Sequence, residues 1–367
     1  MESGSLFGGV FEGRRVFVTG HTGFKGSWLA SWLLDMGAEV TGFALEPPTT
    51  PSLFEELGLA SRITHHIGDV RDLAAVSAAM QAACPDFVFH LAAQPLVRLS
   101  YAEPVETYAT NIMGTVNVLE AVRAVDSVRV VVNVTSDKCY ENRETGQAYR
   151  EDDAMGGYDP YSSSKGCAEL VTGAYRRSFF GADSPVRLAS VRAGNVIGGG
   201  DWALDRIVPD CVRALAAGEP IVVRNPDAVR PWQHVLEPLS GYLLLASRMW
   251  RDGAEFDGPW NFGPDEQGVV RVREVVEAIV SAWGSGSWEL PSNPGPALHE
   301  AHLLALDITK AKTQLGWRPV YSIDTTLAVT ARWYAAERSG ADAAALVASD
   351  IDAYTSRASA AGAVWTS

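Results

Sequence analysis

Cysteine is scarce in this 367-residue sequence, and the few that occur are widely spaced. Cys84, Cys139, Cys167 and Cys211 include no C-x-x-C pair. This spacing excludes a small secreted scaffold held together by disulfides. We therefore expect a reducing, cytoplasmic setting, with these cysteines packed in the core rather than acting as nucleophiles.

Long apolar runs are also absent. No stretch approaches the ~18 uninterrupted apolar residues that a membrane span requires. Residues 1–13 lack the basic start and apolar centre of a signal peptide. We expect a soluble protein without a targeting segment and without a membrane partner.

Positive charge is in deficit, with 30 Lys and Arg against 44 Asp and Glu and a formal net charge of −14. Such a surface repels a nucleic-acid backbone, so we expect no nucleic-acid partner. An anionic small molecule stays possible, because a few converging arginines overcome a diffuse acidic background at close range. The seven histidines show no metal-ligand spacing, and we expect no metal.

Short β-branched runs alternate with longer helical patterns in the first half of the chain. The runs at 16–19, 39–44, 87–91 and 128–134 are typical of strands buried on both faces. The patterns at 28–36, 73–83 and 105–125 are long enough for crossover helices. They predict an α/β fold with a Rossmann-type, doubly wound parallel sheet and a ligand at the carboxyl ends of its strands.

The composition changes after a predicted strand at 188–193. Three successive glycines, scattered prolines and many tryptophans follow, with shorter strands predicted at 221–223 and 260–262. We expect residues 1–195 to form the nucleotide-binding domain, with a return segment near 225–262. Residues 196–367 then form mainly a smaller C-terminal lobe, and 341–363 is expected to be a helix with a frayed end.

A glycine-rich stretch lies where the first strand turns into a helix. Gly20, Gly23 and Gly26 are spaced so that backbone N–H groups can approach a pyrophosphate at the positive end of the helix. The alternative is an ordinary tight turn. His21 or Lys25 could contact a phosphate, although an exposed lysine is equally common at a helix start.

Two acidic residues follow the next strands. Glu46 lies near the end of the second strand, where a carboxylate would bind a ribose, but Pro47 and Pro48 follow it directly, so NAD and NADP both stay open. Asp69 follows the third strand and could reach an adenine or serve as a helix N-cap.

A tyrosine and a lysine four residues apart carry the sharpest chemical signal. Tyr161 and Lys165 share a helix face, and Ser136 lies at the end of a preceding strand. An ammonium group lowers the pKa of a nearby phenol, so the tyrosinate can take a hydroxyl proton while a hydride leaves the same carbon. The alternative is an ordinary amphipathic helix.

These features resemble the extended short-chain dehydrogenase/reductase superfamily of nucleotide-sugar enzymes. The resemblance spans nearly the whole chain and includes the glycine loop, 91–94, 111–115, Ser136, Tyr161 with Lys165, and 192–195. Segments 299–300 and 315–319 are similar to the superfamily's carboxyl lobe. Longer strings at 20–28, 135–142 and 230–235 are similar to the CDP-glucose 4,6-dehydratases within it.

The resemblance implies a bound NAD, with NADP less favoured. It places the cofactor against residues of the glycine loop, of three later strand ends and of the catalytic helix: Gly20, His21, Gly23, Phe24, Lys25, Gly26, Asp69, Val70, Leu91, Ala92, Ala93, Gln94, Asn111, Tyr161 and Lys165.

The resemblance also implies conversion of CDP-glucose to CDP-4-keto-6-deoxyglucose and water. Tyr161 would deprotonate the C4 hydroxyl, Lys165 would hold the tyrosine and the ribose, and Ser136 would hydrogen-bond the new ketone. Elimination further needs an acid at C6 and a base at C5, which a simple 4-epimerase lacks. Asp137 resembles the acid, and it must be protonated at neutral pH.

Lys138 is assigned to proton transfer at C5, with a water relay or enolate stabilisation as the competing version. The dTDP-glucose relatives carry a glutamate at this position. A lysine acts as a base only if burial or another cation depresses its pKa, and the adjacent carboxylate acts in the opposite direction.

Substrate contacts are expected mainly from arginines. Arg206 and Arg230 are the candidates for the diphosphate, and Arg224 is a weaker third. Asn195 resembles a sugar-diphosphate contact or caps a turn, and His299 is a further candidate. Trp202 or Trp232 could stack on a base, although buried packing is the better reading of both.

Other functions compete with the dehydratase reading. They are a dehydratase acting on another nucleotide sugar, a nucleotide-sugar 4-epimerase and, more remotely, an NAD-sensing scaffold. Superfamily members commonly pair through helices near 113–125 and 164–176, so we expect a homodimer, with a tetramer as the alternative.

Overall fold

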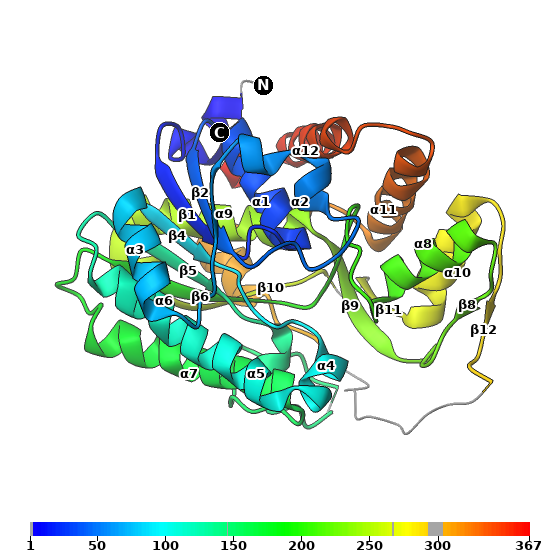
Figure 1. Cartoon of the computed structure of the whole chain (residues 1–367), viewed down its shortest axis with the longest axis horizontal. Helices are drawn as coiled ribbons and strands as arrows, with labels where there is room; N and C mark the ends of the chain where they lie inside the picture. Colours follow the sequence, from blue (N-terminus) through cyan, green and yellow to red (C-terminus); the bar gives the residue numbers. More distant parts are fainter. Residues whose placement is uncertain (1–2, 145, 266–267, 293–303) are drawn as a thin grey trace.

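A single parallel sheet of seven strands organises the computed structural model, which describes residues 3–144, 146–265, 268–292 and 304–367. Its spatial order is β10-β6-β5-β4-β1-β2-β3 (Figure 1). The strands are β1 Arg15–Thr19, β2 Glu39–Ala44, β3 Thr64–Ile67, β4 Phe87–His90, β5 Val130–Val134, β6 Arg187–Ala193 and β10 Gly258–Phe262. The predicted Rossmann-type fold is therefore confirmed.

Helices cover both faces of this sheet, which explains why its strands are apolar on both sides. Along β1, Val16 and Val18 join one core while Phe17 joins the other. The first core packs under α1 (Phe24–Asp35), α9 (Leu236–Asp252) and α12 (Ala343–Ala360). The second packs under α3 (Leu73–Ala83), α6 (Gly114–Arg123) and α7 (Pro160–Ser178).

The crossover predicted as one helix over 105–125 is interrupted. It consists of α5 (Pro104–Tyr108), a π-helical turn (η3, Ala109–Met113) and α6. Periodicity alone does not distinguish this arrangement from a regular helix. Asn111 lies in the middle of this turn, and π turns of this kind often mark functional positions.

A smaller group of elements lies beside the sheet (Figure 1). It has one three-stranded sheet in the order β11-β9-β7 and a two-stranded sheet of β12 and β8. Its elements are β7 Asn195–Ile197, α8 Ile207–Ala217, β8 Ile221–Val222, β9 Val229–His234, β11 Val269–Arg271, α10 Val272–Trp283, β12 Trp288–Glu289 and α11 Ile323–Arg338.

Between β9 and β11 the chain returns to the large sheet through α9 and β10. The strand predicted at 260–262 belongs to β10, which pairs in parallel with β6 at the sheet edge rather than with the short strands. The division into domains at residue 195 stays a prediction. The remaining short elements are η1 Ser3–Gly9, α2 Leu53–Glu56, η2 Leu59–Ser61, α4 Val97–Ala102, η4 Asp137–Cys139, η5 Gly253–Phe256, η7 Ala311–Leu315 and η8 Val364–Thr366.

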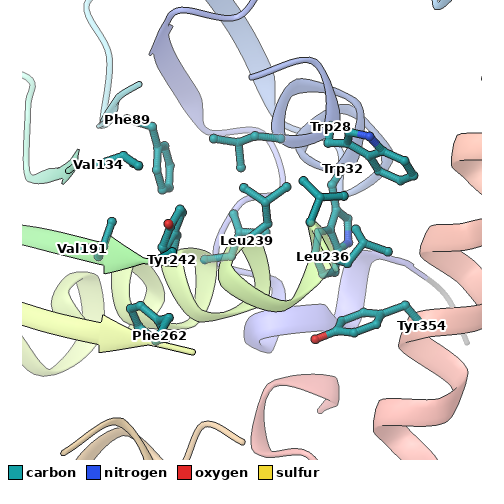
Figure 2. Close-up of a cluster of buried hydrophobic side chains, with 14 of the residues drawn as sticks. Trp28, Trp32, Phe89, Val134, Val191, Leu236, Leu239, Tyr242, Phe262 and Tyr354 are labelled. Atoms are coloured by element: carbon teal, nitrogen blue, oxygen red, sulfur yellow. The ribbon is translucent and has the colours of Figure 1, made fainter. Parts of the chain in front are cut away.

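Aromatic side chains fill the core between α1, α9 and α12. Figure 2 shows Trp28 and Trp32 of α1 facing α9, with Tyr354 of α12 nearby. Trp365 stacks on Phe7 and on Tyr354, with ring centroids 5.1 and 5.7 Å apart. The expectation of a frayed C-terminal end is therefore wrong, because Trp365 is almost fully buried.

None of the helices in the described ranges has the length and apolar character needed to cross a membrane.

Candidate active site

The glycine loop between β1 and α1 has the shape that a bound diphosphate requires. Gly20 has φ +75°, and a Cβ there would lie 2.6 Å from the backbone N of Ala92. A Cβ on Gly26 would collide with the carbonyl of Gly20, whereas one on Gly23 would meet only that carbonyl at 3.5 Å. Gly23 is also the N-cap of α1 and provides no side-chain cap, so the positive end of the helix stays open to an anion.

The side chain of His21 packs against the neighbouring strands. Its Nε2 lies 2.7 Å from Nδ1 of His65, and its ring meets Phe54 edge-on. Burial lowers the pKa of His21 to about 3. The imidazole is therefore neutral and packs against His65 and Phe54. The backbone N–H groups of the loop can bind an anion without this side chain.

Asp69 lines an open surface depression of about 630 Å³ beyond β3. Its carboxylate accepts from Arg71 Nε at 2.8 Å, and this hydrogen bond holds the pKa of Asp69 below its usual value. The helix N-cap reading of Asp69 is wrong, since Asp72 caps α3 by accepting from two backbone N–H groups. Val70 packs against Gly114 at the start of α6.

The loop after β4 is fixed by hydrogen bonds to the π turn. Asn111 accepts from the backbone N of Gln94 at 2.9 Å and donates to Ser164 Oγ of α7 at 2.8 Å. The Ala92 N–H donates to Thr19 Oγ1 at 3.2 Å. Asn111 thus connects residues 91–94 to α7, the helix that carries Tyr161. It makes these hydrogen bonds from the π turn that interrupts the predicted helix.

Ser136, Asp137 and Tyr161 meet where β5 ends and α7 begins. Ser136 caps the short helix η4: its Oγ accepts from the Lys138 N–H at 3.2 Å and donates to Asp137 Oδ1 at 3.0 Å. A further hydrogen bond with Ser136 lowers the pKa of Tyr161. Within the described residues, the second carboxyl oxygen, Asp137 Oδ2, has no hydrogen-bond partner.

Burial dominates the electrostatics of this cluster. It raises the pKa of Asp137, against the opposing charges of Lys138 and Arg230, which favours the protonated acid that elimination requires. It also raises the pKa of Tyr161 to about 12. The expectation that Lys165 lowers the phenol pKa is not met here. The ammonium donates to the Val134 carbonyl at 3.3 Å, while Ser136 and Arg206 lower the pKa of the phenol.

Three candidate substrate arginines differ in their surroundings. Arg206 precedes α8, pairs with Asp201 at 3.0 Å, and its charge acts on Tyr161. Arg230 is buried in β9, and its charge acts on Asp137. Arg224 pairs with Asp205 at 2.8 Å on the surface.

The other substrate candidates have these positions. Asn195 is half-buried in β7, opposite Trp232 of β9, rather than in a turn. Trp232 donates to the Val270 carbonyl, and Trp202 packs edge-on against Tyr334, so both indoles have packing contacts. His299 lies outside the described residues.

Two residues at the site, Lys25 and Tyr242, have surroundings that the sequence did not indicate. Lys25 turns inward, and its burial, together with the charges of Arg206 and Lys165, lowers its pKa to about 7. Its Nζ lies 5.8 Å from the ring centroid of Tyr242, which rises from α9 toward the sheet (Figure 2). The sequence gave no signal for Tyr242, because it stands among the apolar residues of α9.

A buried ion pair supports α7, the helix that carries Tyr161 and Lys165, on the side facing β6. Glu169 Oε2 lies 2.7 Å from Arg192 Nη2 and also accepts from Ser190 Oγ. Glu169 follows Lys165 by four residues and Tyr161 by eight, so all three share one face of α7. That spacing is the signal by which the sequence could have revealed Glu169.

In the described ranges, no three His, Cys, Asp or Glu side chains are grouped to hold a metal ion.

Comparison with known proteins identifies the family of this chain. The family described as GDP-mannose 4,6 dehydratase matches residues 17–330. The chain belongs to this family. A CDP-glucose 4,6-dehydratase of Salmonella typhimurium is 53% identical over 337 residues, which cover 90% of this chain and 93% of that protein. The resemblance inferred from the sequence motifs is therefore confirmed.

Solved structures of related dehydratases and epimerases share the fold of this family member. A UDP-glucose 4-epimerase of Thermus thermophilus, in complex with NAD, is 25% identical, with a TM-score of 0.76 over 88% of this chain and 99% of that chain. A dTDP-glucose 4,6-dehydratase of Streptomyces venezuelae is 24% identical, with a TM-score of 0.75 over 89% of this chain and 98% of that chain. The latter supports the fold.

Proposed function

We propose that this protein is an NAD-dependent CDP-glucose 4,6-dehydratase. It converts CDP-D-glucose to CDP-4-keto-6-deoxy-D-glucose and water, a product that feeds deoxysugar biosynthesis. The observation that carries the proposal is Asp137, a buried carboxyl beside Ser136 and Tyr161 whose pKa burial raises. An epimerase has no use for this acid, and the 53% identical relative is named for the same reaction.

The residues present fit an NAD at the carboxyl ends of the strands. The open N-terminus of α1 and the uncrowded Gly23 suit its diphosphate, and the surface depression beside Asp69 suits its adenine. Glu46 is exposed just beyond β2 and is our candidate for the ribose hydroxyls, which favours NAD over NADP. When bound, NAD supplies the hydride acceptor for C4 and the hydride donor for C6.

The chain's own groups divide the proton chemistry. Tyr161 accepts the proton of the C4 hydroxyl, and Ser136 donates a hydrogen bond to the ketone that forms. Lys165 holds the tyrosine and the ribose. Asp137 protonates the departing C6 hydroxyl from its unpartnered Oδ2 side, and Lys138 takes and returns the proton at C5.

Side chains from the smaller group of elements beside the sheet hold the nucleotide sugar. Arg206 and Arg230 both act electrostatically on catalytic groups, so a diphosphate bound to them lies within reach of Tyr161 and Asp137. Asn195 supplies a further polar contact from β7, and His299 stays a candidate for substrate binding on the family resemblance alone. These guanidinium groups offset the acidic background of the chain for a doubly charged ligand.

Proton NMR with four glucose conjugates tests the reaction and the base preference together. Purified protein is incubated with NAD and with the glucose conjugates of CDP, dTDP, UDP or GDP. We expect a new C6 methyl doublet with CDP-glucose. A doublet with another conjugate alone refutes the base assignment, and galactose-type signals without a methyl group indicate epimerisation. No reaction with any conjugate supports the NAD-sensing scaffold.

We also propose a homodimer in the cytoplasm. Met113 of the π turn and Leu170 of α7 are 50 and 61% exposed, and both lie in the segments near 113–125 and 164–176 through which superfamily members commonly pair. A reducing compartment suits the four cysteines, which are all free thiols. Light scattering should give twice the mass of one chain, and Leu170→Glu should give a monomer. A monomeric wild type refutes the dimer, and a fourfold mass indicates the tetramer.

A further inference from the structure

An exposed ion pair joins the large-sheet part of the chain to the smaller group of elements. Asp205 belongs to the smaller group, in the segment between β7 and α8. Arg98 belongs to α4, which follows β4 of the large sheet. The Arg98 Nε lies 3.6 Å from Asp205 Oδ1, and the two side chains are 41 and 40% exposed. The pair therefore links the part that carries the proposed catalytic residues to the part that holds the nucleotide sugar.

Arg98 is firmly attached to the loop after β4. Leu96 is the N-cap of α4, and Arg98 follows it by two residues. The buried side chain of Gln94 donates to the Leu96 carbonyl at 3.1 Å and to Thr107 Oγ1 at 2.8 Å. The Leu96 N–H donates back to Gln94 Oε1. The first turn of α4, with Arg98, is thus fixed to residues 91–94 at the end of β4.

Asp205 directly precedes Arg206, one of the two arginines that we assign to the diphosphate. Asp205 has φ +60°, in the left-handed region that Asp and Asn adopt more readily than most residues. Arg206 is the N-cap of α8 and pairs with Asp201 at 3.0 Å. The Asp201 N–H donates to the Tyr334 hydroxyl of α11 at 3.0 Å. The segment 201–206 is thus anchored to α11 at one end and to α8 at the other, and Asp205 joins it to α4.

Arg224 orients the carboxylate of Asp205 from its own side. Its Nη1 donates to Asp205 Oδ1 at 2.8 Å. Arg224 follows β8 and so belongs to the smaller group, like Asp205. This hydrogen bond therefore holds the carboxylate in place without linking the two parts of the chain, and only the contact with Arg98 crosses between them.

We propose that the ion pair between Arg98 and Asp205, here called the latch, holds Arg206 in position for the diphosphate of the nucleotide sugar. Arg98 and Asp205 are positioning residues, and Arg206 makes the contact with the ligand. The latch fixes the segment 201–206 before the ligand arrives, so less conformational entropy is lost on binding. The inference rests on the proposed function, which supplies the diphosphate contact of Arg206.

The latch and simple electrostatics predict opposite effects for one substitution. Asp205→Asn keeps a residue that accepts a positive φ but removes a negative charge beside the binding site of an anion. Electrostatics alone would strengthen the binding of CDP, whereas loss of the latch weakens it. We expect CDP to bind NAD-loaded Asp205→Asn about two- to fivefold more weakly than wild type in calorimetric titration at low salt, the range typical of exposed ion pairs. Unchanged or tighter binding would refute the latch.

A double-mutant cycle separates the ion pair from the individual charges of its members. Arg98→Gln should also weaken CDP binding, and adding Asp205→Asn should weaken it no further, because the latch is lost only once. Arg98→Lys keeps the charge and should restore most of the affinity. At high ionic strength the ratio between wild type and Arg98→Gln should approach one. Two losses that multiply, or a ratio that persists in high salt, would contradict the proposal.

An equally exposed ion pair on α9 supplies the matched control. Arg248 and Asp252 lie 2.8 Å apart, with side chains 42 and 37% exposed. Because α9 leads into β10 of the parallel sheet, its last turn lies at the amino ends of the strands, opposite to the proposed site. Arg248→Gln should leave the affinity for CDP unchanged. If it weakens CDP binding as much as Arg98→Gln does, net charge explains the effect and the latch is refuted.

Steady-state kinetics with CDP-glucose distinguish failure of the latch from failure of the proposed function. Arg98→Gln should raise KM about two- to fivefold and leave kcat unchanged, because the latch acts on binding of the nucleotide and not on the chemical steps. An unchanged KM, with a wild type that forms the methyl product, refutes the latch alone. A wild type that forms no methyl product refutes the proposed reaction, while the CDP titrations still test the latch. A wild type that does not bind CDP refutes both.

Discussion

Breaking the buried ion pair behind the catalytic helix should destabilise the whole protein. Glu169 and Arg192 have side chains 4 and 3% exposed and lie 2.7 Å apart. Arg192→Met keeps the length of the side chain but leaves a buried carboxylate without its counter-charge. Loss of one partner from such a pair typically costs about 3–5 kcal/mol of unfolding free energy.

This loss corresponds to a modest change in melting temperature. Globular proteins unfold with an entropy of about 2.1 cal/mol/K per residue, or about 0.8 kcal/mol/K for a chain of this length. A loss of about 4 kcal/mol therefore lowers the Tm by about 5 °C. Urea unfolding followed by fluorescence measures the free energy directly, and calorimetry measures the Tm.

The pH dependence distinguishes an ionic contribution from simple packing. Arg192 and the hydroxyl donors hold the pKa of Glu169 below its ordinary 4.5. Because the native pKa is depressed, the stabilisation is present above about pH 4.5 and is lost as the pH falls through the native pKa. Glu169→Gln should therefore be less stable than wild type at pH 7, and the difference should narrow in acid.

An exposed ion pair on α6 supplies the matched control. Arg123 and Glu120 pair at 2.8 Å with side chains 40 and 32% exposed, and Arg123→Met should cost at most about 1 kcal/mol. If Arg192→Met costs no more than Arg123→Met, the buried pair does not stabilise the fold as argued. The electrostatic account would also be contradicted if the difference in unfolding free energy between wild type and Glu169→Gln did not change with pH.

Three further predictions concern other parts of the structure. Gly23→Ala should leave the Tm of the cofactor-free protein unchanged, because a Cβ fits there, but should weaken NAD binding in calorimetric titration. Gly26→Ala should lower the Tm, because a Cβ there collides with the Gly20 carbonyl. Equal losses of Tm in the two variants would contradict this account of the loop. The unfolding free energy of the wild type minus that of His234→Gln should fall by up to about 1.4 kcal/mol per pH unit as the pH drops below 6.5, because buried His234 has a native pKa of about 3 and accepts a proton only when unfolded. A difference that does not change with pH would refute this account. Tyr242→Phe should not lower the Tm, because the Tyr242 hydroxyl has no hydrogen-bond partner among the described residues. Tyr354→Phe removes a 2.9 Å hydrogen bond to Glu237 and should lower the Tm. A larger loss of Tm in Tyr242→Phe than in Tyr354→Phe would contradict this assignment.

The sequence predicted those features that depend on local patterns. The continuous apolar runs identified four strands of the parallel sheet, because strands buried on both faces need such runs. The glycine spacing located the loop before α1, and the four-residue spacing of Tyr161 and Lys165 placed both on one helix face. Family resemblance supplied Asp137 and Lys138, whose roles no spacing rule gives.

Features that depend on distant contacts could not be predicted in this way. The sequence leaves Lys25 open between a phosphate contact and an exposed lysine at a helix start, and its burial beside Tyr242 of α9 depends on packing between distant segments. The π turn at Asn111 depends on hydrogen bonds to Gln94 and Ser164, which lie 17 and 53 residues away along the chain. Trp365 lies in a small-residue tail, and its stacking on Phe7 joins the two ends of the chain.

The late return of the chain to the sheet affects how this protein emerges from the ribosome. The core that supports the glycine loop includes Trp28 and Trp32, but α9 and α12, which cover them, are synthesised some 200 and 300 residues later. Until then the nascent chain exposes one apolar face of its sheet, a condition that favours aggregation and chaperone binding. The proposed catalytic residues end at position 165, yet the scaffold that holds them is completed only when α12 has been made.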